Sequence, residues 1–84
     1  FAADPVKHAR HVVRALFVFS MLDRRGMALA EVPAYIASVP VYGQMREGFL
    51  GGSNEELAES LVADLTRAGA LVLEAGMLRP TMRA

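Results

Sequence analysis

Apolar and polar residues alternate with the period of an α-helix over the first quarter of the chain. Asp4 followed by Pro5 is typical of a helix start, because aspartate caps free backbone N–H groups and proline at the first helical position gives up no hydrogen bond. We predict a helix from there to about Arg24, ending at Gly26. At about 100° per residue, one face is mainly apolar and the opposite face is basic. The first face holds Ala9, Val12, Val13, Leu16, Phe19 and Ser20, and the second holds Lys7, Arg10, His11 and Arg14.

The second half of this predicted helix is apolar on every side. Val18, Met21 and Leu22 continue the line of the basic residues, so no polar face remains there. A helix of that kind lies centrally in its domain or is covered by a partner.

The middle of the chain reads as short elements separated by proline and glycine. Residues 27–30 suit a brief extended segment, and a second helix is predicted from Pro33 to about Val39, ended or broken by Pro40. Its inward residues are expected to be Val32, Ile36 and Tyr35. Residues 41–52 leave two interpretations open, a short helix or an irregular loop. Near-helical spacing of Val41, Met45, Phe49 and Leu50 favours the helix, and four glycines favour the loop.

The last third of the chain carries the clearest local signals. Ser53 and Glu56 form a capping box at the start of a third helix, and Gly69 provides its left-handed end. Residues 70–74 and 77–79 are predicted to form a hairpin around a tight turn, and Pro80 suits an edge strand. The buried stripe of the third helix is expected to comprise Leu57, Leu61, Leu65 and Ala68, with Ala58 and Val62 beside it.

This order of elements predicts an α+β fold, mostly helical, with three or four helices and a C-terminal β-hairpin. Leu61-x-x-x-Leu65-x-x-x-Gly69-Ala70-Leu71-Val72-Leu73, followed by Ala75-Gly76-Met77-Leu78-Arg79-Pro80-Thr81, resembles the third helix and wing of winged-helix (helix-turn-helix-like) domains. The resemblance covers residues 10–81. One departure is the connection from the second to the third helix, which is longer than the usual turn. An irregular helical bundle with a terminal hairpin is the alternative fold.

The resemblance implies DNA binding, with the third helix in the major groove and the wing on the backbone. Binding of that kind requires cations that face phosphates. Residues 53–76 instead hold one cation and five acidic residues, a net charge of −4, which a duplex would repel. The exposed face of the third helix is expected to present Glu55, Glu56, Glu59, Ser60 and Arg67, with Asp64 at its boundary. A DNA-binding domain of a transcriptional regulator or DNA-processing protein, contacting DNA through the first helix and the wing, is the alternative function.

Residues 1–27 carry the opposite charge, five cations against two acidic residues. Lys7, Arg10, His11 and Arg14 form a candidate basic surface with three interpretations: a phosphate contact, an ordinary solvated face, or attraction to the acidic third helix of another protomer.

Composition bounds the class of protein. The chain has 84 residues, is 54% hydrophobic and has no cysteine, so burial alone must hold a single domain together. We expect one domain over residues 1–84, a fragment of a longer protein because the chain begins at Phe1, and a cytoplasmic location. No apolar stretch approaches the roughly 20 residues that cross a bilayer, so no membrane partner is expected.

Candidate chemistry does not assemble into a site. His8 and His11 are three residues apart, but apart from Asp4 no cysteine or nearby carboxylate is present to complete a metal site. Serines, tyrosines and histidines give no nucleophile with a base and an orienting group. The Gly51-Gly52-Ser53 segment resembles an anion cradle, yet Glu55 and Glu56 would oppose an anion. We therefore expect no enzyme, cofactor, metal or small-molecule substrate, and leave open an accessory domain of a larger enzyme.

An excess of apolar residues remains after one small core is counted. These extra apolar residues either enlarge the core or form an exposed patch. Such a patch would bind a second copy of the chain or a neighbouring domain of the parent chain. We predict a protein-interaction or oligomerisation module; if the patch is exposed, Met21→Glu or Phe49→Glu should give a folded monomer. The candidate protein interface comprises Phe17, Val18, Met21, Leu22, Met45 and Phe49.

Overall fold

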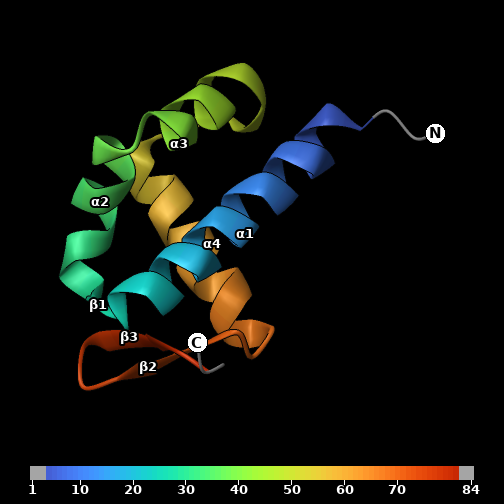
Figure 1. The fold of residues 1–84 in the computed structure, drawn as a ribbon. Coiled ribbons are helices and arrows are strands. Elements are labelled where there is room, and N and C mark those ends of the chain that lie inside the picture. Colours follow the sequence, from blue (N-terminus) through green and yellow to red (C-terminus); the bar gives the residue numbers. More distant parts are fainter. Residues whose placement is uncertain (1–3, 82–84) are drawn as a thin grey trace.

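Helices form most of the chain, and a small sheet closes one end of them (Figure 1). The computed structural model describes residues 4–81. Among these residues there are four α-helices and a C-terminal hairpin, which confirms the α+β, mostly helical class. In chain order the elements are α1 (Pro5–Arg24), β1 (Met27–Ala28), the 3₁₀ turn η1 (Leu29–Glu31), α2 (Val32–Ser38), α3 (Pro40–Met45), the π-helical turn η2 (Arg46–Leu50), α4 (Asn54–Arg67), β2 (Leu71–Glu74) and β3 (Met77–Pro80).

The predicted boundaries of α1 are confirmed. The Asp4 carboxylate accepts a hydrogen bond from the Lys7 backbone N–H at 3.1 Å, and Pro5 occupies the first helical position. At the other end Arg25, rather than Gly26, is the left-handed cap, with φ of 61°. Gly26 follows with φ of +109° and leads directly into β1.

The buried face of α1 differs from the predicted one. Phe19, expected to point inward, is 67% exposed. Phe17 and Met21, expected in a surface patch, are 0% exposed, so their assignment to an interface is wrong. The reason is that α1 lies against α3, η2, α4 and β3, and this surround selects a row four residues apart over the face that an isolated helix would favour. The buried row is Ala9, Val13, Phe17 and Met21.

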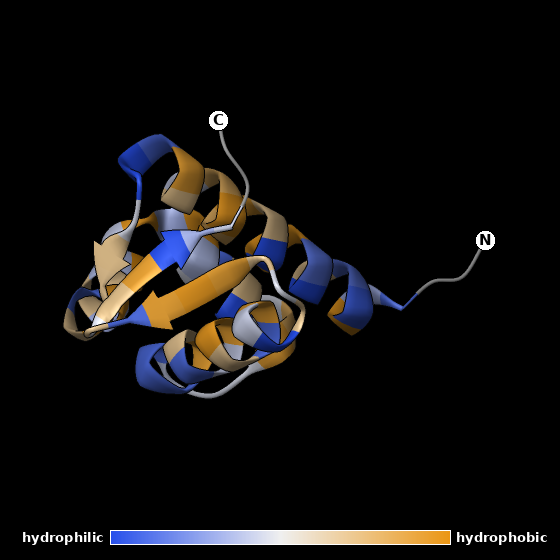
Figure 2. Ribbon diagram, turned by 90° about the horizontal axis from the view of Figure 1, so that it is seen from below, coloured by the Kyte–Doolittle hydropathy of each residue, from blue (hydrophilic) through white to orange (hydrophobic). Residues whose placement is uncertain are grey.

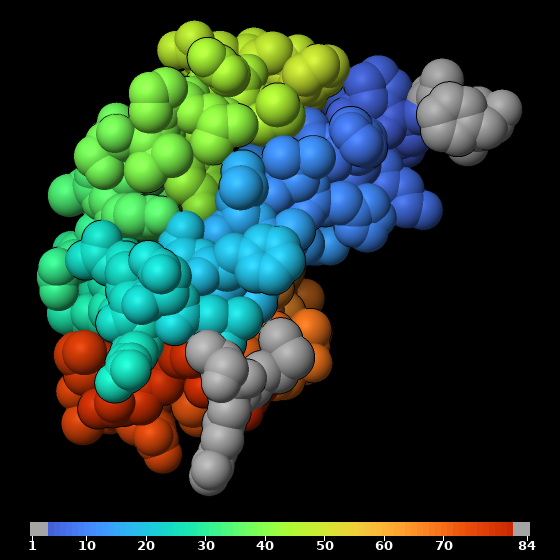
Figure 3. Space-filling view, viewed as in Figure 1, coloured from blue at the N-terminus to red at the C-terminus, as the bar shows by residue number. Residues whose placement is uncertain are grey.

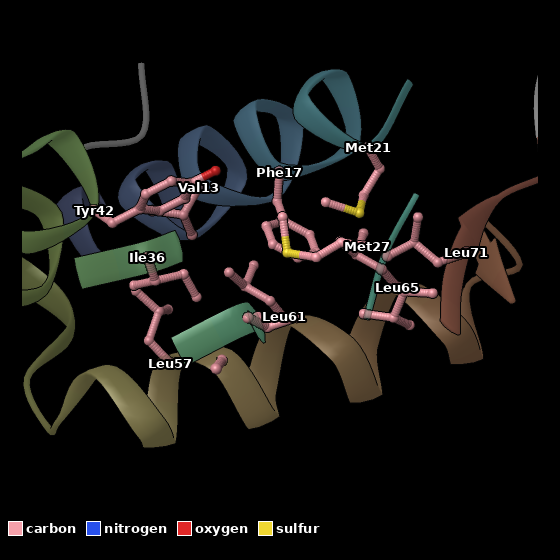
Figure 4. Close-up of a cluster of buried hydrophobic side chains, with 13 residues drawn as sticks. Val13, Phe17, Met21, Met27, Ile36, Tyr42, Leu57, Leu61, Leu65 and Leu71 are labelled. Atoms are coloured by element: carbon pink, nitrogen blue, oxygen red, sulfur yellow. The ribbon is translucent and has the colours of Figure 1, made fainter. Parts of the chain in front are cut away.

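One hydrophobic core lies between α1 and α4 (Figure 4). Side chains of Val13, Phe17 and Met21 point from α1 toward the leucines of α4. Leu57, Leu61 and Leu65 are buried as predicted, whereas Ala68 is exposed because it caps α4 beyond the core. The capping box of Ser53 and Glu56 is confirmed by both of its hydrogen bonds, at 2.8 and 3.1 Å.

Residues 41–52, left open by the sequence, are mostly helical. Val39 is extended, with φ of −109° and ψ of 111°, so the chain breaks there and Pro40 starts α3. The buried residue of this segment is Tyr42, which apolar spacing did not select, while Phe49 is 46% exposed. In α2, Val32 and Ile36 are buried as predicted, and Tyr35 is half-buried with its ring centroid 6.0 Å from that of Tyr42.

The sheet has three antiparallel strands in the order β1-β3-β2. The predicted hairpin is confirmed, and positive φ values of 50° at Ala75 and 76° at Gly76 allow its two-residue turn. The expectation of an edge strand, drawn from Pro80, is wrong because β1 pairs with β3 and makes it central. That pairing covers only Met77 and Leu78, so it ends before the proline is reached.

Candidate functional site

The predicted protein interface does not form one exposed patch. Besides the buried Phe17 and Met21, the side chains of Val18 and Met45 are half-buried and pack against the core. Leu22 is also half-buried. Phe49 alone among these six residues is exposed, so this set offers a partner little apolar surface.

The predicted basic surface is divided in a similar way. Lys7, Arg10 and His11 are exposed on α1, but Arg14 reaches α4, where its NH2 group lies 2.7 Å from the Asp64 carboxylate. This hydrogen bond holds the pKa of Asp64 below its usual value, and the Arg67 guanidinium at 3.3 Å adds to the effect. Arg14 is therefore committed to a contact within the chain and is no free cation.

A hydroxyl cluster lies where α1, α2 and α3 meet. The Tyr35 hydroxyl donates to Ser20 Oγ, and the Arg24 guanidinium carbon lies 5.1 Å from the Tyr35 ring centroid. The Tyr42 hydroxyl is buried, and burial together with the neighbouring Tyr35 raises its pKa. A tyrosine of this kind keeps its proton at neutral pH, so Tyr42 supplies a packed ring rather than a base.

The described residues near these hydroxyl groups do not form a catalytic or metal-binding site. Within residues 4–81, no three histidine or acidic side chains come close enough to hold a metal ion. His8 and His11 are exposed on α1, and Ser53 is occupied by its capping role. In the same range no helix has the length and hydropathy needed to cross a membrane.

An apolar groove with a volume of about 510 Å³ lies between the η1–α2 segment and α4. Two glutamates of α4, Glu55 and Glu59, lie at this groove, and neither forms an ion pair within the described part of the chain. Since they are four residues apart, their like charges repel each other. We call this surface the α2–α4 groove; its apolar lining is Leu29, Val32, Pro33, Ala58, Val62 and Ala63.

From the sequence, only the α4 side of this groove could be predicted. Ala58 and Val62 were expected beside the leucine stripe of α4, and Glu55 and Glu59 on its solvent face. The opposite wall comes from residues 29–33, which no local pattern connects with α4. The small side chains of Ala58 and Ala63 leave the hollow that larger residues would fill.

Two apolar side chains of the sheet are also partly exposed. In β2, which is an edge strand, Val72 and Leu73 are 37% and 44% exposed. Figure 2 shows β2 as the strongly hydrophobic strand of the sheet seen from below. Because neighbouring residues of a strand point to opposite faces, Val72 and Leu73 do not share one surface, and Val72 lies beside the exposed Arg79 of β3.

No family model matches the chain, and comparisons with curated proteins and with solved structures find no similar protein.

Proposed function

We propose that this chain is a winged-helix-like protein-interaction module without catalytic activity, and that it binds its partner through the α2–α4 groove. The observation that carries the proposal is the chemistry of the groove, an apolar hollow of about 510 Å³ flanked by two glutamates on α4 that form no ion pair with any residue of 4–81. A hollow of this kind suits an apolar side chain flanked by cations.

The winged-helix part of the proposal is supported by the order of the elements. A helix, a strand, two helices separated by an insertion, and a hairpin follow one another, and the first strand adds to the hairpin to give the sheet order β1-β3-β2. In that arrangement α2 and α4 correspond to the two helices of a helix-turn-helix.

The insertion between α2 and α4 replaces the usual short turn. Arg46 ties it to the start of α4, since its Nε donates to Asn54 Oδ1 at 3.1 Å and its NH1 donates to the Gly52 carbonyl at 2.7 Å. No residue of the insertion lines the α2–α4 groove, whose wall opposite α4 is formed by Leu29 of η1 and by Val32 and Pro33 of α2.

Electrostatics favour a protein over DNA as the partner. The first turns of α4 expose Glu55, Glu56 and Glu59, which a phosphate backbone would repel. Arg14, one of the cations available to a DNA-binding surface on α1, is bound to Asp64. Lys7, Arg10 and Arg79 are exposed and would be the contacts of the alternative DNA-binding function.

A display selection tests the proposal. We would pan random peptides of about 16 residues, long enough for roughly four helical turns, on the wild-type chain and on an Ala63→Arg variant. Ala63 is exposed and lines the groove, so arginine there should fill the hollow and leave the fold intact. Ala15→Arg is the matched control, because Ala15 is exposed on α1 and lies outside the groove.

We expect selected peptides to combine an apolar residue with lysine or arginine, and to bind Ala63→Arg at least about tenfold more weakly than wild type. Their binding to Ala15→Arg should be unchanged. Equal recovery on all three proteins would contradict the proposal. Micromolar binding to a random duplex by fluorescence anisotropy, weakening steeply with salt and lost in Arg10→Ala, would replace it with the DNA-binding function.

A further inference from the structure

The amino-terminal turns of α1 extend past the core. Residues 4–8 are all exposed, and the first buried residue of the helix is Ala9. Figure 3 shows this end of α1, in blue, on the far side of the molecule from the teal and green surface of η1 and α2. The helix therefore presents an end that its own domain does not cover.

The chemistry of this end is complementary to that of the α2–α4 groove. Val6 is 39% exposed and lies beside Lys7 and one turn before Arg10. Neither cation forms an ion pair within the described residues. An apolar side chain next to two cations on α1 thus matches an apolar hollow beside Glu55 and Glu59 on α4.

The two surfaces cannot meet within one chain. The 20 residues of α1 make a helix about 30 Å long, since each residue adds about 1.5 Å. Its carboxyl end leads through Gly26 into β1 and η1, where Leu29 lines the groove. Ala9, Val13, Phe17 and Met21 hold this continuous helix in the core, so its exposed first turn cannot bend back to the groove of the same molecule.

We infer that the α2–α4 groove binds the amino-terminal end of α1 from a second copy of this chain. Val6 enters the apolar hollow, and Lys7 and Arg10 approach Glu55 and Glu59. We take the contact to be head-to-tail, with each copy binding one neighbour through its groove and another through its α1 end, so that association continues beyond the dimer into chains or rings of molecules. The inference rests on the proposed function and names the partner of the same groove.

Such a contact is small and partly ionic, so it should be weak and sensitive to salt. We would measure the weight-average mass of the 84-residue protein by sedimentation equilibrium from about 10 μM to about 1 mM. At low ionic strength the mass should rise with concentration and pass the dimer value. At about 1 M salt, where the screening length is about 3 Å, it should return toward the 9.1 kDa monomer.

A charge exchange identifies the surfaces. Lys7→Glu with Arg10→Glu gives one variant, and Glu55→Lys with Glu59→Lys gives the other; all four residues are exposed, so both variants should fold. Each variant alone faces like charges across the contact and should stay monomeric. Mixed in equal amounts they should associate, because each end of α1 then meets a groove of opposite charge. Asp23→Lys with Glu74→Lys is the matched control, exposed and outside the groove, and should associate like wild type.

Two results would overturn the inference. One is a monomer at every concentration and low salt, and the other is association that neither pair of substitutions weakens. In both cases groove-dependent peptide selection would still support the proposed function. Failure of that selection, together with monomers throughout, would overturn both.

Discussion

The carbonyl oxygen of Leu78 explains why position 26, two residues after α1, has to be glycine. A Cβ at Gly26 would lie 2.6 Å from the Leu78 carbonyl oxygen, and the φ of +109° is one that side chains rarely adopt. The sequence marked Gly26 as the end of a helix. The structure adds that the backbone of β3 passes so close that no side chain fits.

Gly26→Ala should therefore lower the free energy of unfolding by about 3 kcal/mol or more, since strain at a positive φ and the backbone clash add together. Urea denaturation followed by circular dichroism measures the change. Gly43→Ala is the control, because Gly43 is helical and a Cβ there meets nothing within 4 Å. It should be neutral or stabilising by up to about 1 kcal/mol. Equal stability of wild type and Gly26→Ala would contradict this account.

Two helices of opposite charge are connected by the ion pair of Arg14 and Asp64. The sequence predicted a basic first helix, which is α1, and an acidic third helix, which is α4. Attraction between these two helices in different protomers was one interpretation of their charges. In the structure, the ion pair between α1 and α4 lies within one molecule, with 2.7 Å between the Arg14 guanidinium and the Asp64 carboxylate. Both side chains are partly exposed, at 34% and 23%, so water weakens the contribution of the pair to stability.

The pH dependence of stability follows from the lowered pKa of Asp64. A carboxyl whose pKa is lower in the folded state contributes stability above its unfolded pKa of about 3.9, and this stability is lost as pH falls through the folded pKa. Asp64→Asn should cost about 1 kcal/mol at pH 7 and make the loss of stability in acid shallower.

Urea titrations at a series of pH values compare wild type with Asp64→Asn. Asp23→Asn is the control, since Asp23 is exposed on α1 and forms no ion pair within residues 4–81. A parallel acid dependence in wild type and Asp64→Asn would show that the ion pair does not stabilise the fold.

At the scale of the whole molecule, burial separates residues that look equivalent in the sequence. Phe17, Phe19 and Phe49 are all apolar residues on predicted or possible helices, yet they are 0%, 67% and 46% exposed. Only the surrounding elements distinguish them. The same is true of the α2–α4 groove, whose walls come from residues 29–33 and 55–63.

The loss of stability on substitution should be larger at the buried positions than at the exposed ones. Phe17→Ala should cost about 3–5 kcal/mol, because it leaves a cavity in the core, whereas Phe49→Ala should cost less than about 1 kcal/mol. Met21→Glu would bury a charge and should prevent folding, while Phe49→Glu should give a folded protein. Circular dichroism melts measure all four, and a folded Met21→Glu protein would contradict the position of α1 in the core.

What the sequence determined by itself is local. The Asp4-Pro5 start, the capping box of Ser53 and Glu56, and the Ala75-Gly76 turn depend on hydrogen bonds and backbone angles within a few residues, and all three are confirmed. The α+β class follows from the order of such elements.

Tertiary structure decided the contacts between distant segments. These are the face of α1 that is buried, the central place of β3, the pairing of Arg14, and the groove that we propose as the binding site. The physical reason is that burial and ion pairing depend on which surfaces meet, and hydrophobic periodicity on one element does not specify its neighbour. The sequence thus defined the elements and their charges, and packing determined which surfaces stay exposed to a partner.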